Sequence, residues 1–214
     1  MTTTAFAFVV AAYLIGSLSF AVIVSRAMGM ADPRSYGSKN PGATNVLRSG
    51  RKLAAVLTLL GDGAKGWLAV ALTAWVGPRY GLGEQAIAMA ALAVLIGHMW
   101  PVFFGFKGGK GVATAVGVLF GFNVWLALAA LASWLFMAFV IKISSLAAIV
   151  ASVLVPVYAY FIVGPHSVYF GTCIIIAILV VHRHKSNLIN LLTGQEGKIG
   201  EKSDVASGKD TPLQ

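Results

Sequence analysis

The sequence predicts an all-α integral membrane protein, a polytopic helical bundle. Of its 214 residues 58% are hydrophobic and only 11% are charged, and the mean hydropathy is +0.83. Soluble domains carry about 25% charged residues, so the composition excludes a soluble protein. The apolar segments run continuously and do not alternate at every second residue, which favours helices over a β-barrel. We expect one transmembrane domain over residues 1–196.

Polar turns divide the apolar sequence into seven expected spans. The stretch 112–141 is ambiguous, because a single helix would place Lys142 outside, whereas a turn at 121–123 makes a hairpin and keeps it inside. We favour the hairpin, although its first arm is short against the roughly 20 residues that a span needs. The alternative is five to six spans with a re-entrant segment. The expected spans are residues 5–25, 53–76, 85–104, 112–120, 124–141, 146–163 and 167–181.

Positive charge gathers in the loops of one expected side. The net charge is +9, and basic residues are concentrated within 26–52, 107–110 and 183–185, whereas Arg79 is the basic residue of an opposite loop. The positive-inside rule predicts an outside N-terminus and a cytoplasmic C-terminus. Nothing in the basic segments suggests nucleic acid as a partner. Residues 197–214 carry balanced charge without apolar periodicity, which predicts a disordered cytoplasmic tail.

The most informative stretch is a polar loop that reads Ser-Lys-Asn-Pro-Gly-Ala-Thr-Asn-Val-Leu-Arg over residues 38–48. Every polar group in lipid needs a partner, so an ordinary connection has little use for these residues, although they also contain a turn signal. An anion site does use them, because amide N–H groups and a guanidinium can surround a phosphate. A helix beginning near Ala43 would add free N–H groups. The candidate ligands are Ser38, Asn40, Gly42, Thr44, Asn45 and Arg48.

A glycine-rich loop follows at residues 104–111, Phe-Gly-Phe-Lys-Gly-Gly-Lys-Gly. Glycines let the backbone approach an anion closely, and the helix expected from Val112 directs its positive end at the same place. The loop is not a nucleotide P-loop, because Phe104 stands where a glycine is needed and Gly111 replaces the Ser or Thr. The simpler alternative is a flexible turn with two interfacial lysines. The candidate ligands are Lys107, Gly108, Gly109, Lys110 and Gly111.

A third polar segment covers residues 182–187. His184 and Asn187 are three apart and would share a helix face, whereas we expect His182 to be structural. No set of Cys, His and carboxylates has zinc-site spacing, so we expect no metal and no cofactor. Asp62 and Lys65 are predicted to form a buried pair that supports the first loop, although charges inside a membrane are often functional.

Together these residues resemble the bacterial acyl-phosphate:glycerol-3-phosphate acyltransferase (PlsY) family. The likeness covers most of residues 13–196. The third motif of the family usually reads His-Arg-x-Asn-Ile-x-Arg-Leu-Leu-x-Gly-x-Glu, and this chain departs from it at Lys185 and Asn190, where Asn190 removes a cation. The landmarks of the resemblance are residues 16–20, 37–48, 97–114, 144–147 and 184–196.

The resemblance implies transfer of a fatty acyl group from acyl phosphate to the 1-hydroxyl of glycerol 3-phosphate, the entry step to phospholipids. It also implies a membrane-embedded enzyme of the bacterial inner membrane, with seven spans and a cytoplasm-facing site, and we expect a monomer. Proton removal could involve His184 or a phosphate oxygen of the substrate, and we favour the substrate. Catalytic roles fall on Ser38, Arg48, Lys110 and His184, with further substrate contacts from Ser145, Asn187 and Glu196.

The competing hypothesis is a small transporter or channel for a phosphorylated solute. Charged residues inside the membrane and interrupted spans would suit such a protein. Against it stand the lack of an internal repeat and the concentration of polar residues on one expected side.

Overall fold

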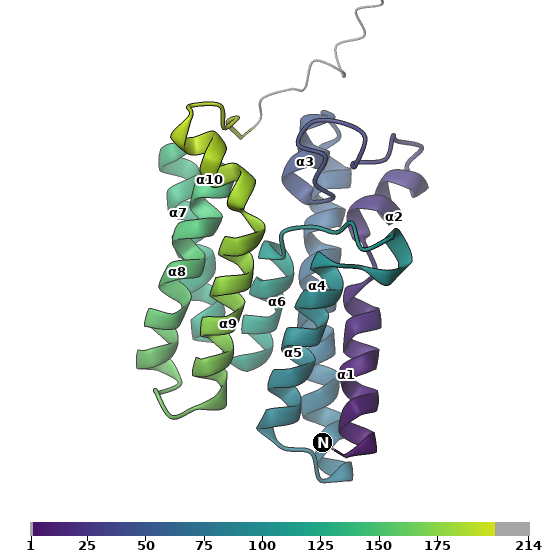
Figure 1. Cartoon of the computed structure of the whole chain (residues 1–214), viewed down its shortest axis with the longest axis vertical. Coiled ribbons are helices and arrows are strands. Elements are labelled where there is room, and N and C mark those ends of the chain that lie inside the picture. Colours follow the sequence, from purple (N-terminus) through teal and green to yellow (C-terminus); the bar gives the residue numbers. More distant parts are fainter. Residues whose placement is uncertain (1, 200–214) are drawn as a thin grey trace, which may run out of the picture.

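The helices form two groups that are joined through α6. The computed structural model describes residues 2–199. In Figure 1, α1 to α5 lie on one side of the bundle and α7 to α10 on the other, with α6 between them. The elements are α1 (Thr3–Gly16), α2 (Phe20–Ala27), α3 (Ala43–Arg48), α4 (Lys52–Val76), η1 (Gly77–Tyr80), α5 (Glu84–Met99), η2 (Val102–Phe104), α6 (Val112–Phe122), α7 (Val124–Ile141), α8 (Ser144–Ile162), α9 (Val168–Arg183) and α10 (Lys185–Leu192).

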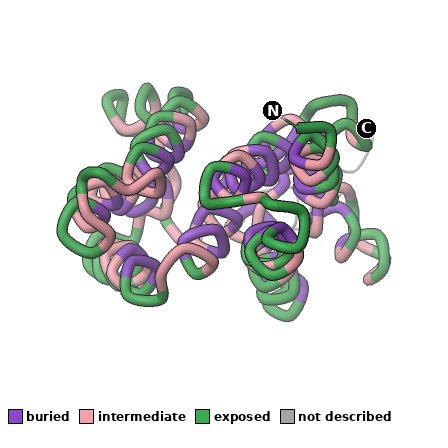
Figure 2. The backbone as a smooth tube through the Cα atoms, turned by 90° about the horizontal axis from the view of Figure 1, so that it is seen from below, coloured by how far each residue is buried: buried purple, intermediate pink, exposed green. Residues whose placement is uncertain are grey.

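Large apolar side chains cover the outside of the bundle. Phe139 is 83% exposed, Phe161 78% and Trp75 69%. Figure 2 shows buried positions gathered toward the inside of each group of helices and exposed positions around the outside. An outer surface of this kind is stable in hydrocarbon and would be costly in water. The chain is therefore an integral membrane protein with multiple helical spans.

Four of the described helices are long and apolar enough to cross a membrane, namely α4, α5, α7 and α8. The pairs α1–α2 and α9–α10 pass the same test together, with bends of 44° and 56°, which gives up to six spans. Helix α6 is apolar but has only 11 residues, fewer than the roughly 20 of a straight span. The seven spans expected from the sequence require α6 to cross as well.

The first expected span, residues 5–25, is not one helix. Residues 17–19 separate α1 from α2, and the two axes differ by 44°. The carbonyl oxygen of Leu18 at this break accepts a hydrogen bond of 2.6 Å from the Lys65 ammonium. Because a backbone group in lipid must find a partner inside the protein, this donor on α4 makes the break tolerable. Apolar composition alone could not reveal it.

The ambiguous stretch 112–141 is a hairpin, as predicted. Only Asn123 separates α6 from α7, so the turn is tighter than the expected 121–123. Its side-chain oxygen accepts from the N–H groups of Trp125 and Leu126, at 2.9 and 3.2 Å. This N-cap satisfies two backbone donors that would otherwise lack a partner at the start of α7.

The polar segments lie at one end of the bundle, and the N-terminus lies at the other (Figure 1). The hydroxyl groups of Thr44 and Ser144 share a hydrogen bond of 3.1 Å, which joins the first loop to the start of α8. The N–H of Ile199 donates to the carbonyl of Lys142 at 2.8 Å. Contacts with the bundle therefore extend beyond the expected boundary at residue 196. The remainder of the expected tail, residues 200–214, lies outside the described residues.

Helices α4 and α6 pack with their backbones in contact. A Cβ atom at Gly117 of α6 would collide with the carbonyl oxygen of Gly63, and one at Gly66 of α4 with the carbonyl oxygen of Thr114. The Thr114 hydroxyl donates to the carbonyl of Asp62 at 3.0 Å. Small residues allow such close approach between helices in lipid. The short α6 is thus fixed against the long α4.

We predict that Gly117→Ala lowers the thermal unfolding temperature of the detergent-purified protein. Overpacking of a tight interface costs about 1–3 kcal/mol, because the α4 backbone has to move away. The control is Gly171→Ala on α9, where a Cβ atom would meet open space and alanine favours the helix by up to about 1 kcal/mol. Equal effects of the two substitutions on unfolding would contradict the packing described here.

Candidate active site

A pocket lies where the three polar segments of the sequence meet. Its volume is about 360 Å³, within the roughly 300–1,000 Å³ of small-molecule sites. The sequence predicted that these distant stretches converge, and the structure confirms it. The pocket is lined by Ser38, Lys39 and Asn40 of the first loop, Trp100, Gly108 and Lys110 around the second, and His182, Arg183, Lys185 and Ser186 of the third.

The lining of this pocket is strongly cationic. It includes Lys39, Lys110, Arg183 and Lys185, and no Asp or Glu is among the described residues that line it. Lys110 is partly buried, and its neighbourhood also contains Arg48, whose charge acts on it. Fixed cations in a partly desolvated pocket repel one another and attract a multivalent anion. The pocket is therefore an anion site at one end of the bundle.

Asn45 shapes the first loop and does not face the pocket. Its side-chain oxygen accepts from the N–H of Ser38 at 2.9 Å, and its amide nitrogen donates to the carbonyls of Pro33 and Tyr36 at 2.7 and 3.2 Å. The side chain is only 2% exposed. The sequence suggested a ligand role for this residue. The structure instead gives it the task of holding Ser38 at the pocket wall.

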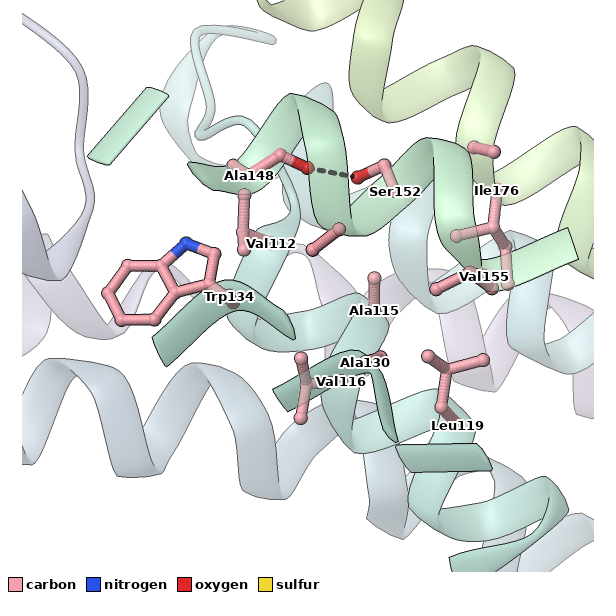
Figure 3. A pocket seen from close by; sticks show the side chains of 12 residues that line it. Val112, Ala115, Val116, Leu119, Ala130, Trp134, Ala148, Ser152, Val155 and Ile176 are labelled. Carbon is pink, nitrogen blue, oxygen red and sulfur yellow. Dashed lines mark hydrogen bonds between the residues drawn. The ribbon is translucent and has the colours of Figure 1, made fainter. Parts of the chain in front are cut away.

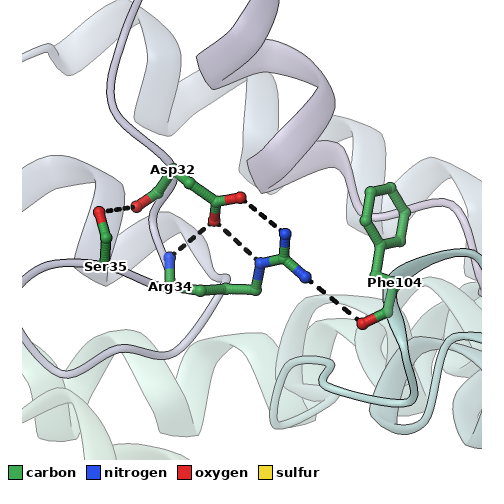
Figure 4. Close-up of polar contacts among 4 residues, drawn as sticks. All are labelled: Asp32, Arg34, Ser35 and Phe104. Atoms are coloured by element: carbon green, nitrogen blue, oxygen red, sulfur yellow. Dashed lines mark hydrogen bonds and ion pairs between the residues drawn. The ribbon is translucent and has the colours of Figure 1, made fainter.

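The first loop is also fastened to the second (Figure 4). The Arg34 guanidinium pairs with Asp32 at 2.7 Å, donates to the carbonyl of Phe104 at 3.4 Å and lies 5.6 Å above the Phe104 ring. Its hydrogen bonds hold the pKa of the Asp32 carboxyl below the usual range. This contact joins the entrance of the first loop to the start of the glycine-rich loop.

Two glycines of the second loop are required by close packing. A Cβ atom at Gly108 would collide with the carbonyl of His98, and one at Gly109 with the His98 ring. Arg183 fixes the other side of this segment by donating to the carbonyls of Gly108 and Gly109, at 2.9 to 3.2 Å. The N–H of Gly109 already donates to the His98 carbonyl at 3.1 Å. This amide, expected from the sequence to bind an anion, therefore stabilises the loop.

Lys110 belongs to a chain of polar contacts that crosses three segments. Its ammonium donates to the side-chain oxygen of Asn187, and the Asn187 amide donates to Glu196 at 2.7 Å. The hydroxyl of Ser145 donates to the same carboxylate oxygen, also at 2.7 Å. The Asn187 oxygen contacts the Lys110 ammonium directly, whereas the Glu196 carboxylate is connected to it through the Asn187 amide. Three expected site residues are thus brought to Lys110: Ser145 from α8, Asn187 from α10 and Glu196 from the chain after α10.

The charge of Lys110 is finely balanced. Its pKa is lowered to about 8, chiefly by burial and to a smaller extent by the positive charges of Arg48 and Arg183, whereas the charge of Glu196 acts in the opposite direction. An anion bound beside the ammonium would therefore raise its pKa again. This is the arrangement expected of a cation that needs a substrate as its counterion.

His184 lies beneath the pocket wall and is 2% exposed. Its Nδ1 is 2.7 Å from the carbonyl oxygen of Val180. Because a carbonyl only accepts, we assign the proton to Nδ1, which leaves Nε2 as an acceptor. The pKa of His184 is lowered to about 4, chiefly by burial and also by the charges of Lys110 and Arg183, although the hydrogen bond to Val180 opposes the shift. The imidazole is therefore neutral near pH 7.

The remaining expected ligands lie outside the pocket. The hydroxyl of Thr44 is bonded to Ser144, and the N–H of Gly42 donates to the carbonyl of Asn40 at 2.9 Å. Lys107 is exposed to solvent, and Gly111 precedes α6 with a φ of 87° that favours glycine. Among residues 2–199, no three His, Cys, Asp or Glu side chains are placed to hold a metal ion.

Several residues of the lining were not predicted from the sequence, and Arg183 is the most important of them. His182 and Ser186 are four residues apart across the α9–α10 bend, so helical spacing could have indicated a common face. Arg183 gave no such signal, because its contacts are with glycine carbonyls 74 and 75 residues away. The lining residues absent from the prediction are Lys39, Trp100, His182, Arg183, Lys185 and Ser186.

A second, apolar cavity of about 30 Å³ lies between α6, α7, α8 and α9. Figure 3 shows Val112, Ala115, Leu119, Ala148 and Val155 around it, with Trp134 at one side. Val112 is the first residue of α6, two positions after Lys110. The short segment 110–112 therefore connects the cationic pocket, lined by Lys110, with the apolar cavity, lined by Val112.

Fold and site together define a polytopic helical membrane protein with an anion pocket at one end, next to an apolar cavity. The family model described as glycerol-3-phosphate acyltransferase matches residues 6–194. The chain belongs to this family. A glycerol-3-phosphate acyltransferase of Chromobacterium violaceum is 85% identical over 205 residues, covering 96% of this chain and 100% of that protein, and one of Thiobacillus denitrificans is 60% identical, covering 91% and 97%.

Two solved structures are similar throughout. One is a crystal structure of PlsY, described as an integral membrane glycerol 3-phosphate acyltransferase, in its glycerol 3-phosphate form. It is 37% identical, with a TM-score of 0.84, and the match covers 92% of this chain and 96% of that one. The lysophosphatidic acid form of that enzyme is 36% identical, with a TM-score of 0.82 and the same coverage.

We predict that sulfate binds to the purified protein and that its affinity falls as the pH rises through about 8. Lys110 loses its charge above its folded pKa of about 8, whereas sulfate keeps its charge over this range. Lys110→Arg keeps a cation that does not deprotonate, so its affinity should stay level. Titration calorimetry at several pH values measures this. The same decline in Lys110→Arg would contradict the assignment to Lys110.

Proposed function

We propose that the chain transfers a fatty acyl group from acyl phosphate to the 1-hydroxyl of glycerol 3-phosphate, giving 1-acylglycerol 3-phosphate and inorganic phosphate. The observation that carries this proposal is the convergence of Lys39, Lys110, Arg183 and Lys185 on one pocket. Both substrates bear a phosphate group, and their mutual repulsion demands several fixed cations. The apolar cavity beside α6 suits the beginning of a path for the acyl chain.

The chemistry needs positioning more than a protein nucleophile. Acyl phosphate is already activated: the glycerol oxygen attacks the acyl carbon, the carbon–oxygen bond to phosphate breaks, and phosphate departs. Lys110 and Arg48 neutralise the charge that builds on the departing group, and Ser38 donates a hydrogen bond. Holding two reactants in line removes much of the barrier. The reaction as written requires no metal or cofactor.

The hydroxyl proton passes to a phosphate oxygen of the substrate. His184 is a poor acceptor for it, because an imidazole with a pKa near 4 stays unprotonated at neutral pH. Its Nε2 instead accepts a hydrogen bond from glycerol 3-phosphate and orients the attacking hydroxyl. Asn187, fixed between Lys110 and Glu196, serves the same substrate. This assignment deepens the preference for a substrate oxygen that the sequence suggested.

We propose seven spans, with α6 as a short crossing segment buried by its neighbours, in one domain over residues 1–196. The N-terminus is outside, and the pocket faces the cytoplasm of a bacterial inner membrane. The positive-inside rule supports this orientation, because the pocket end carries Lys39, Lys142 and Lys185 and the opposite end carries Arg79. One copy supplies all three polar segments, so the working unit is a monomer.

A transporter is less consistent with the geometry. Its best sequence evidence was the charged pair Asp62 and Lys65 inside the membrane. Lys65 is bound both to Asp62 at 2.8 Å and to the carbonyl of Leu18 at 2.6 Å, and its side chain is 2% exposed. A buried ion pair that is bound to the backbone at the α1–α2 break does not line a solute path.

We predict that the purified chain releases phosphate only when both acyl phosphate and glycerol 3-phosphate are present. Lys110→Ala and Ser38→Ala should each reduce kcat/KM about 100-fold or more, the size expected when a donor to developing charge is removed. Phosphate release and product formation are measured in detergent, with unfolding temperatures as the check on folding. Lys107→Ala is the matched control, since this exposed lysine does not line the pocket. Near-normal turnover in Lys110→Ala would contradict the proposal.

We predict that Lys39→Cys and Lys185→Cys react with a membrane-impermeant thiol reagent only from the cytoplasmic side, and Arg79→Cys only from outside. The natural protein should give little background labelling, because Cys173, its one cysteine, is fully buried. Labelling of intact cells and of inverted vesicles distinguishes the two sides. If Lys39→Cys and Arg79→Cys react from the same side, the proposed topology is wrong.

A further inference from the structure

We propose that Asp62, Lys65 and His98, a polar triad inside the bundle, are positioning residues that hold the two phosphate-binding loops in register. This inference rests on the proposed function. None of the three lines the pocket, and all are buried, with exposures of 2%, 3% and 7%. They belong to α4 and α5, yet their contacts reach the second loop and the α1–α2 break that leads into the first loop.

Lys65 controls the approach to the first loop. Its ammonium bridges Asp62 on its own helix and the carbonyl of Leu18 at the break between α1 and α2. It also lies 6.0 Å from the centre of the Phe20 ring, at the first residue of α2. The direction of α2 determines where the chain enters the loop that carries Ser38. Lys65 therefore fixes that direction from inside the membrane.

His98 controls the second loop. Its carbonyl accepts the N–H of Gly109 at 3.1 Å, and its ring fills the space where a Gly109 side chain would stand. Lys110 follows directly. On its other side, a Cβ atom at Gly109 would approach the carbonyl of Pro41 in the first loop at 3.1 Å. The ring thus supports a point at which the two loops lie close together.

Asp62 connects the two ends of the triad. The same oxygen of Asp62 lies 2.8 Å from the Lys65 ammonium and 3.5 Å from Nδ1 of His98. Nδ1 is buried without a hydrogen-bond partner among the described residues, so Asp62 is the polar group that it faces. The carbonyl of Asp62 also accepts from Thr114 in the first turn of α6. One residue therefore relates the first loop, the second loop and α6.

Stability alone does not explain these polar residues. An apolar trio of similar volume would often be as stable or more stable in a buried site. It would leave the carbonyl of Leu18 without a donor and would not fix the rotation of the His98 ring. A misplacement of about 1 Å can cost roughly 100-fold in rate when a reaction depends on positioning. The triad is therefore placed to affect turnover through Ser38 and Lys110.

The test compares His98→Asn with His98→Gln. The Asn amide nitrogen takes the place of Nδ1 and still faces Asp62, whereas the longer Gln places its amide at the position of Nε2. We expect His98→Asn to keep kcat within about threefold of wild type and His98→Gln to lose about tenfold or more, through displacement of Lys110. Steady-state kcat and KM for glycerol 3-phosphate are measured on the full chain in detergent, together with unfolding temperatures.

A second variant guards against misfolding of the His98 substitutions. Asp62→Asn combined with Lys65→Met keeps the packing without charge, so we expect a folded protein whose kcat falls about tenfold or more. Tyr158→Phe is the matched control, because it removes a partly buried hydrogen bond of 2.6 Å to Ser133, which joins α7 to α8 away from both loops. It should lower stability without lowering kcat.

The proposal is overturned if His98→Asn and His98→Gln have equal kcat, or if the double variant turns over like wild type. It is also overturned if kcat in every variant, Tyr158→Phe included, simply follows the unfolding temperature, because that pattern describes a structural role only. Absence of turnover in the wild-type protein would instead refute the proposed function. The two failures are therefore distinguishable in one series of assays.

Discussion

The bridge from Arg183 to the glycine-rich loop is the interaction on which the pocket depends. One guanidinium at the end of α9 donates to the carbonyls of Gly108 and Gly109 and lies 5.2 Å above the Trp100 ring. It connects the two groups of helices at the point where Lys110 enters the pocket. A planar fork of donors suits this task, whereas a lysine would provide a single point contact. The pocket exists because these two groups meet there.

Convergence of cations creates an electrostatic problem that the structure solves only in part. Lys110 lies near Arg48 and Arg183 in a partly buried site, and burial, together with repulsion among these cations, lowers its pKa. Among the described residues, Glu196 is the acidic group that opposes this effect, and its oxygen already accepts from Ser145 and Asn187. The remaining excess of positive charge favours binding of a multivalent anion. A pocket that lacks internal compensation is well suited to two phosphate groups and poorly suited to being empty.

How much the sequence could predict depended on the range of the interactions. The membrane class, the hairpin at Asn123 and the convergence of three polar segments followed from composition, turn signals and the clustering of residue types. The break at residues 17–19 did not, because its cause is the distant Lys65. Asn45 had the right chemistry for a ligand, but its three hydrogen bonds go to the loop backbone. Residue type indicates which hydrogen bonds a side chain can make, and only the fold determines its partners.

The rigidity of the two loops matters for the proposed chemistry. The proposed reaction is a direct transfer between a bound acyl phosphate and bound glycerol 3-phosphate, with no covalent intermediate on the protein. Its rate would therefore depend on how well the loops fix the geometry of the two substrates. Glycines packed on His98, the Arg34 contact with Phe104 and the Asn45 hydrogen bonds all restrict loops that would otherwise be mobile. In the proposed reaction, the polar groups that look costly inside this membrane protein are therefore the ones that position the substrates.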